Sequence, residues 1–200
     1  MSYAIVGFGS VGQALARTFA RKGIDVTVAS RRPAEALAPQ ARAIGPTVMA
    51  RSLRDAVEAD TIILAVPFGE HRDVAKILPR WDGKTIIDTT NAFGVPLDEL
   101  AGLPSSIVVA KAFTGSKLVK GFNHLIAAKL AADPIVEGAH RVVFLSSDDE
   151  DAVAPVAALA HHLGFAPVSL GKLNEGGALV HARGRTWGPL IFQDLFKKEQ

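Results

Sequence analysis

The sequence predicts an α/β fold with a doubly wound, mainly parallel sheet and a small helical C-terminal part. Short apolar runs of strand type alternate with helix-forming segments along most of the chain, which is the pattern of parallel-sheet proteins. Residues 3–6 lead directly into a glycine loop of sequence GFGSVG, and a helix and a second strand follow it. Residues 61–66 are apolar without a break, as expected of a strand buried on both faces. Together these observations indicate a Rossmann-type sheet.

The composition is that of a soluble, globular chain. Hydrophobic residues make up 48% of the 200 residues and charged residues 21%, close to the globular average. We expect residues 1–171 to form the Rossmann domain and residues 172–200 to form a helical segment packed on it. No apolar run is long enough to span a membrane, and the first residues carry no export signal. We therefore expect a cytoplasmic protein without a membrane partner.

Charge and residue types exclude several kinds of site. The chain has no cysteine, which excludes disulfides, thiolate metal sites and cysteine nucleophiles. No histidine stands at ligand spacing from carboxylates, so no metal site is expected. The net charge is only +2 and the basic residues are scattered, so a nucleic-acid partner is not expected either. An isoelectric point of about 9.0 suits a small anionic ligand.

The first half of the chain has clear element boundaries. The helix after the glycine loop has an apolar face of Val11, Leu15, Thr18 and Phe19, and it ends at Lys22-Gly23. Strands are predicted at residues 24–29, 47–50 and 61–66. Residues 34–43 favour a helix, but Pro39 interrupts it, so only a short helix is expected. Ser52 can cap a helix that runs to residue 59.

The alternation continues in the second half. Strands are predicted at residues 84–88, 117–122, 141–146 and 166–170. Helices are predicted at residues 69–78, 105–113, 123–132 and 148–163, and Asn123 can cap the third of them. Residues 91–103 contain too much proline and glycine for regular structure. The chain closes with helical stretches at residues 173–183 and 188–198.

The glycine loop predicts a dinucleotide site because each glycine has a separate physical task. Gly7 permits the tight turn, Gly9 lets the backbone approach a pyrophosphate, and Gly12 lets the helix pack closely on the strand. The helix N-terminus then offers free N–H groups and a positive dipole to the phosphates. A glycine turn without a ligand is the alternative, which the order of the surrounding elements disfavours. The predicted binding segment is Gly7, Phe8, Gly9, Ser10, Val11 and Gly12.

The end of the second strand predicts NADP(H) as the dinucleotide. An NAD-binding chain normally places an acidic residue there, against the ribose 2′-hydroxyl. This chain has no acidic residue at that point and carries Ser30, Arg31 and Arg32 instead. A hydroxyl and two guanidinium groups can hydrogen-bond to a 2′-phosphate. Two solvated arginines without a ligand are the alternative.

The loops after the fourth and fifth strands should line the same site, because ligands of doubly wound sheets lie across the carboxyl ends of the strands. The first loop contributes Ala65, Val66 and Pro67, which suit a chain that passes close to a ribose. In the second loop, Asn91 can hydrogen-bond to the nicotinamide side, and Ala92 lies beside it.

Six segments of the chain resemble one protein family. They are GFGSVG, ASRRP, AVPF, DTTNAFG, KLVKGFNHL and LGFAPVSLG, spread over almost the whole length. Together they resemble the NADPH-dependent coenzyme F420 reductases, also called F420-dependent NADP oxidoreductases. The family usually reads VVKAFN where this chain reads LVKGFN, so Gly121 is a small departure. The same domain is similar to the NADPH-binding part of STEAP-type metalloreductases.

The resemblance implies a Rossmann domain with a small helical C-terminal part over the cofactor, assembled as a homodimer. It implies that Ser30, Arg31 and Arg32 bind the 2′-phosphate, in agreement with the prediction from the residues alone. It also implies hydride transfer between NADPH and a flat redox cofactor, either F420 or a flavin. The acceptor pocket would be built partly by Asn123 and His124 and partly by the C-terminal segment.

Few catalytic side chains are expected, because hydride transfer between two cofactors leaves the chemistry to the cofactors. If a side chain acts as a proton donor, His124 is the first candidate. The alternative is that His124 is a residue of a helix first turn without a catalytic role. Asp88 is better explained as a turn cap, and Lys120 can face the site or solvent. We expect three aromatic residues of the last segment to be core rather than acceptor wall: Trp187, Phe192 and Phe196.

Two other functions remain compatible with the sequence. One is the NADPH-dependent reduction of a small carbonyl or imine compound, which would require a proton donor such as His124. The other is a non-catalytic module that senses NADP(H) and responds by binding a partner.

Overall fold

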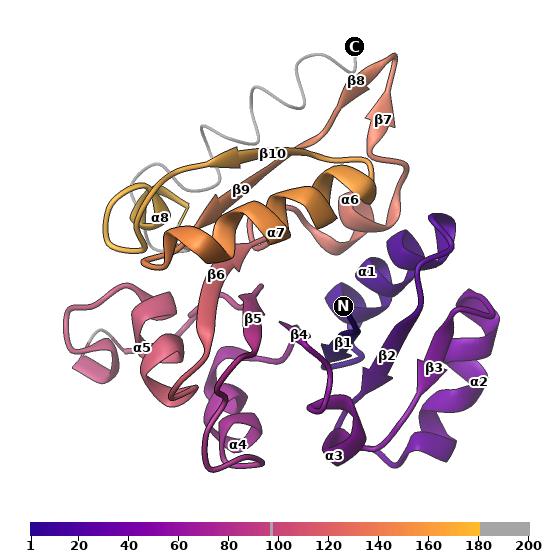
Figure 1. Ribbon diagram of the computed structural model, residues 1–200, viewed down its shortest axis with the longest axis horizontal. Coiled ribbons are helices and arrows are strands. Elements are labelled where there is room, and N and C mark those ends of the chain that lie inside the picture. Colours follow the sequence, from indigo (N-terminus) through magenta and orange to yellow (C-terminus); the bar gives the residue numbers. More distant parts are fainter. Residues whose placement is uncertain (97, 181–200) are drawn as a thin grey trace.

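The computed structural model describes residues 1–96 and 98–180, and its centre is an eight-stranded sheet (Figure 1). The strand order is β10-β9-β6-β5-β4-β1-β2-β3. All neighbouring strands are parallel except β6 and β9, which run antiparallel, so the predicted mainly parallel sheet is confirmed. The strands are β1 (Tyr3–Val6), β2 (Val26–Ala29), β3 (Val48–Ala50), β4 (Thr61–Leu64), β5 (Thr85–Asp88), β6 (Lys117–Gly121), β9 (Val142–Ser146) and β10 (Ala166–Ser169).

Helices connect these strands, and a short hairpin projects from the body of the molecule (Figure 1). The hairpin consists of β7 (Ile135–Val136) and β8 (Ala139–His140), and nothing in the sequence predicted it. The helices are α1 (Ser10–Arg21), α2 (Ala34–Ile44), α3 (Leu53–Ala56), η1 (Phe68–Glu70), α4 (His71–Ala75), η2 (Asp98–Leu100), α5 (Ser105–Ala112), α6 (Ala127–Ala131), α7 (Glu150–His162) and α8 (Gly176–Leu179). Among the described residues, no helix is long and apolar enough to cross a membrane.

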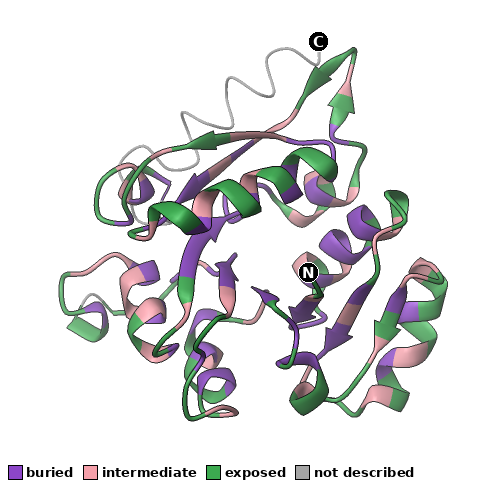
Figure 2. Ribbon diagram, in the orientation of Figure 1, coloured by how far each residue is buried: buried purple, intermediate pink, exposed green. Residues whose placement is uncertain are grey.

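Both faces of the sheet are covered, because alternate side chains of each strand enter different cores. On β1, Ile5 belongs to a core with α1, α2, α6 and α7, whereas Ala4 and Val6 belong to a core with α3, α4 and α5. On β4, Ile63 belongs to the first of these cores and its neighbour Ile62 to the second. Figure 2 shows the resulting buried strands between partly exposed helices. The fold is therefore doubly wound, as predicted.

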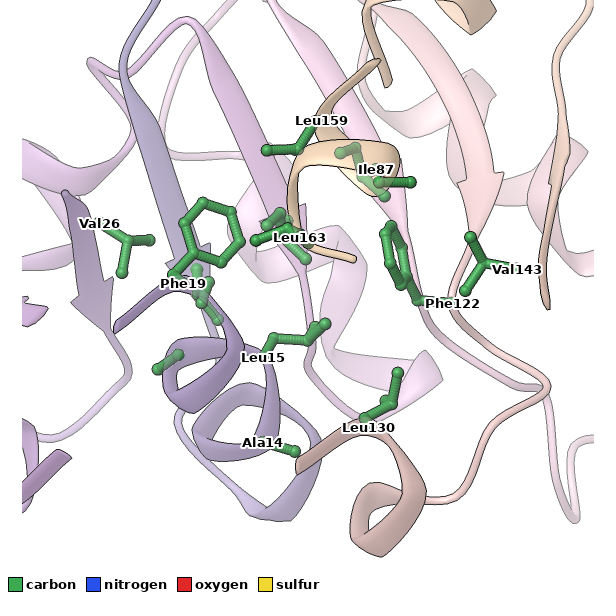
Figure 3. Packing of buried hydrophobic residues seen from close by; sticks show 14 of the residues in the cluster. Ala14, Leu15, Phe19, Val26, Ile87, Phe122, Leu130, Val143, Leu159 and Leu163 are labelled. Carbon is green, nitrogen blue, oxygen red and sulfur yellow. The ribbon is translucent and has the colours of Figure 1, made fainter. Parts of the chain in front are cut away.

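The core under α1 joins both halves of the chain (Figure 3). Leu15 and Phe19 point from α1 toward Leu163 after α7 and Phe122 after β6. Thr18, on the same face of α1, is also buried, and its hydroxyl donates to the Leu130 carbonyl oxygen of α6 at 2.8 Å. Burial of this face is the reason the helical periodicity in the sequence was informative.

Two predicted helices differ from the structure. Helix α2 runs without interruption past Pro39, so the expected break is wrong. Proline removes one backbone donor, but Pro39 lies on the exposed face of α2, where water can satisfy the unpaired carbonyl group, while Leu37 and Ala41 anchor the buried face. Asn123 does not cap α6, which begins only at Ala127. Its side chain makes tertiary hydrogen bonds instead.

Several other boundaries also move. Helix α3 ends at Ala56 rather than at residue 59, although Ser52 does cap it by accepting from the Asp55 N–H at 3.1 Å. The helix predicted at residues 69–78 is the shorter pair η1 and α4. A helix was predicted at residues 173–183, of which the structure describes 173–180. In that part only α8 is helical. The helix predicted at residues 188–198 and the aromatic residues Trp187, Phe192 and Phe196 lie outside the described residues.

Candidate functional site

A cavity of about 460 Å³ lies at the carboxyl ends of β1, β2 and β4. It brings together most of the predicted cofactor-binding residues: Gly7, Phe8, Gly9, Ser30, Arg31, Arg32, Ala65, Val66 and Pro67. These residues come from three separate loops, and the sheet order makes those loops neighbours. Six further residues line the cavity and were not predicted from the sequence: Val6, Leu53, Glu70, Asp73, Val74 and Ile77.

The glycines of the first loop have the conformations that their predicted tasks require. Gly7 has φ +102°, and a Cβ atom added there would lie 2.3 Å from the Ala65 carbonyl oxygen. A Cβ atom on Gly12 would lie 1.9 Å from the Gly7 carbonyl oxygen. Around Gly9, by contrast, nothing lies within 4 Å of such an atom. At Gly7 and Gly12, neighbouring backbone atoms therefore leave no room for a side chain. At Gly9, which lines the cavity, the space beside the backbone is open.

Helix α1 begins at this opening with an uncapped N-terminus. Gly9 is its N-cap residue, so no side chain hydrogen-bonds to the first turn, and that turn contains no acidic residue. Ser10, Val11 and Gly12 form the first turn and do not line the cavity themselves. Unpaired N–H groups and the positive end of the helix dipole make such a position suitable for phosphate groups.

The loop after β2 presents two guanidinium groups and one hydroxyl. The Arg31 Nη2 atom donates to the Glu70 Oε1 atom of η1 at 2.8 Å, and the Arg31 side chain is 75% exposed. Arg32 Nη2 donates to Gln40 Oε1 at 3.4 Å, and the Arg32 N–H donates to the Ser30 hydroxyl oxygen at 3.1 Å. Ser30, Arg31 and Arg32 thus line the same cavity, and their binding of a 2′-phosphate stays a prediction. Glu70 was missed because only the fold brings it there.

The ends of β5 and β6 are joined by an amide pair that was also missed. Asn91 Nδ2 donates to the Asn123 carbonyl oxygen at 2.8 Å, and Asn123 Nδ2 donates to Asn91 Oδ1 at 3.1 Å and to the Val180 carbonyl oxygen at 2.9 Å. Ala92, the next residue after Asn91, is fully buried. Asn91 and Ala92 do not line the cavity but lie at the neighbouring strand end. Their contact with a nicotinamide stays a prediction.

A buried ion pair joins the same two strands, β5 and β6, a few residues before the amide pair. Lys120 Nζ donates to Asp88 Oδ2 at 3.1 Å and also to the Thr90 carbonyl oxygen, while Asp88 Oδ1 accepts from the Thr90 N–H at 2.9 Å. Asp88 is therefore a turn cap, as expected, and an ion-pair partner in addition. Lys120 faces neither the cavity nor solvent. Burial lowers the pKa of the Lys120 amine, and Asp88 partly opposes that effect.

His124 is enclosed rather than open to the cavity. It is 1% exposed, its Nε2–H donates to the Val142 carbonyl oxygen at 3.1 Å, and its ring lies 4.9 Å from the Phe144 ring. Desolvation lowers the pKa of His124 to about 4, so the ring is neutral at pH 7. Its suggested role as a proton donor stays a prediction. Within residues 1–96 and 98–180, no cluster of His, Asp or Glu side chains could hold a metal ion.

Residues 2–92, which contain the cavity-lining loops, match the family model described as "NADP oxidoreductase coenzyme F420-dependent". A crystal structure of a hypothetical protein, SMa0349 from Sinorhizobium meliloti, has 39% sequence identity and a TM-score of 0.86, with 92% of this chain and 91% of that chain covered. The resemblance to the coenzyme F420-dependent NADP oxidoreductases that the sequence indicates is therefore confirmed, and the family match covers residues 2–92.

Two other relatives extend the comparison. A putative F420-dependent NADP-reductase from Arthrobacter sp. FB24 shares the fold, with a TM-score of 0.73, 24% identity and 99% and 93% coverage of the two chains. The mouse metalloreductase STEAP2 is 30% identical over 179 residues, which is 86% of this chain. The chain spans about a third of the length of the curated relatives it matches, covering 33% of each.

Proposed function

We propose that the protein is an NADPH-dependent oxidoreductase that transfers hydride between NADP(H) and a flat redox cofactor, either F420 or a flavin. The observation that carries this proposal is the cavity, which is lined both by the open glycine loop and by Arg31 and Arg32. An uncapped helix N-terminus beside the loop supplies the phosphate-binding donors. The match of residues 2–92 to the F420-dependent family model and the similarity to the metalloreductase STEAP2 also support an NADPH-dependent oxidoreductase.

The lining residues fit the parts of NADP(H) separately. The pyrophosphate would lie at Gly9 and the first turn of α1, and the 2′-phosphate at Ser30, Arg31 and Arg32. The apolar side of the cavity would receive the adenine ring, and it is formed by Leu53, Pro67, Val74 and Ile77. When bound, NADPH supplies the hydride. The protein's contribution is to hold both partners in one geometry and to exclude water.

The direct test is to mix the purified protein with NADPH and to follow the absorbance of F420, with FMN as a parallel acceptor. Bleaching of F420, of FMN or of both identifies the acceptor and supports the proposal. Tight NADPH binding without reduction of either acceptor would contradict it. In that case small carbonyl or imine substrates, or a sensing role, would become the functions to test.

Assembly as a homodimer belongs to the same proposal, because the resemblance of the sequence to the family implies it. The molecular mass in solution at micromolar concentration, measured by light scattering, tests the dimer. A monomeric mass would contradict it.

A further inference from the structure

We propose that Lys120 is a positioning residue for the nicotinamide half of the cofactor. Together with Asp88 it holds the ends of β5 and β6 in one arrangement, and the amide pair Asn91–Asn123 depends on that arrangement. This inference rests on the proposed function, because it requires NADP(H) to lie across the carboxyl ends of the strands. It goes beyond that function by assigning a task to a buried lysine that contacts neither cavity nor solvent.

The ion pair lies near the ends of two neighbouring strands. Asp88 and Lys120 are directly opposite each other in the parallel pair β5–β6, and Asp88 is the last residue of its strand. Their side chains are 0% and 2% exposed. A buried ion pair is a poor source of stability, since the desolvation of both charges offsets their attraction. We attribute the pair to what it holds in place rather than to stability.

Lys120 binds the loop after β5 as well as Asp88. Lys120 Nζ binds the Thr90 carbonyl oxygen as well as the Asp88 carboxylate, and that carboxylate accepts from the Thr90 N–H. Both backbone polar groups of Thr90, its N–H and its carbonyl group, are thus hydrogen-bonded to the ion pair, one residue before Asn91. A third anchor is the Thr89 hydroxyl, which donates to the Leu64 carbonyl oxygen at 2.9 Å. The loop after β5 is therefore fixed to both neighbouring strands, β4 and β6.

The backbone has an unusual conformation directly after β6. Phe122 has φ +59°, a left-handed conformation that is rare for a bulky residue and is typically kept where surrounding contacts enforce it. This turn directly precedes Asn123, which meets Asn91. Asn123 is 5% exposed, and its Oδ1 atom has no partner in the part of the chain that the structure describes. Strain and an unpaired buried acceptor together are typical of a functional position.

The order of the strands would place the two halves of a dinucleotide at different strand ends. The cavity with Arg31 lies at β2 and β1, and the sheet continues through β4 to β5 and β6. A dinucleotide that begins at β2 extends across the switch point toward β5. Its nicotinamide half therefore approaches the loop that Lys120 and Asp88 hold, whereas its adenosine half does not.

The test compares two ligands, NADPH and adenosine 2′,5′-bisphosphate, which lacks the nicotinamide half. Binding of both is measured by titration for the wild type, Lys120→Met and the double variant Asp88→Leu/Lys120→Met. The double variant leaves no unpaired charge in the core, so it remains foldable if the single variant is not. Lys117→Met is the matched control, because Lys117 is on the same strand in an exposed ion pair with Asp149.

We expect the ratio of the two affinities to change. Relative to the bisphosphate, NADPH should bind about tenfold more weakly in Lys120→Met and in the double variant, with the bisphosphate affinity within about twofold of wild type. Lys117→Met should leave the ratio unchanged. An unchanged ratio in the folded double variant, or an equal loss of both ligands, would overturn the inference. Failure of the wild type to bind either ligand would instead overturn the proposed function itself.

Discussion

The guanidinium group of Arg31 lies 2.8 Å from the carboxylate of Glu70, and both residues line the same cavity. Arg31 follows β2 and Glu70 belongs to η1, so this contact joins two segments at the position where we propose that the 2′-phosphate binds. The Arg31 side chain is largely exposed, and exposed ion pairs of this kind contribute at most about 1 kcal/mol. Arg31 can therefore exchange Glu70 for a phosphate at small cost.

Arg31→Ala should weaken NADPH binding by about 10- to 100-fold, because a hydrogen bond to a charged group contributes about 1.5–3 kcal/mol. NADH lacks the 2′-phosphate, so its affinity should change little. Titration of both nucleotides measures the effect. Arg42→Ala, an exposed arginine on α2 outside the cavity, serves as the control. Equal losses for NADPH and NADH would contradict the assignment of the 2′-phosphate site.

Glu70→Gln should strengthen NADPH binding by up to about fivefold. The substitution removes a negative charge next to the expected phosphate position and frees Arg31 from an ion pair worth at most about 1 kcal/mol. NADH affinity should stay constant, and raising the salt concentration should reduce the difference between variant and wild type. Weaker NADPH binding in Glu70→Gln would mean that Glu70 orients Arg31 rather than competing for it.

Two glycines of the same loop should respond to alanine in opposite ways. Gly12→Ala places a methyl group 1.9 Å from the Gly7 carbonyl oxygen and should cost about 2 kcal/mol of unfolding free energy. Gly9→Ala has no neighbour within 4 Å and should alter stability by less than about 0.5 kcal/mol while weakening NADPH binding. Urea unfolding and nucleotide titration separate the two effects. Full NADPH affinity in Gly9→Ala would argue against a phosphate at this position.

His124 should make the fold sensitive to acid. Its pKa is lowered from 6.5 to about 4 in the folded state, so the unfolded chain binds the extra proton as pH falls below 6.5. Stability should therefore decline between pH 6.5 and pH 4 by an amount on the order of 3 kcal/mol from this residue. Urea unfolding of wild type and His124→Gln at pH 4.5 and pH 7.5 measures the difference. Identical pH dependence in both proteins would contradict the buried, neutral state.

Much of the fold could be predicted from local patterns. Strands were predicted at residues 3–6 and 61–66, where burial on both faces leaves a continuous apolar run. Strand β1 has the predicted bounds, and β4 ends two residues earlier than predicted, at Leu64. Pro39 was misinterpreted because the sequence does not show whether a helical proline faces solvent. The hairpin β7–β8 has only four paired residues and left no periodic pattern to detect.

By itself, the sequence determined the glycine loop, the basic end of β2 and the strand-helix alternation, since each of these depends on residues that are neighbours along the chain. Only the tertiary structure decided that Glu70 faces Arg31, that Lys120 pairs with Asp88, and that Asn123 binds Asn91 instead of capping a helix. The physical reason is that these contacts join residues 32 to 39 positions apart. Their meeting depends on which strand ends become neighbours in the sheet, and no local propensity encodes that order.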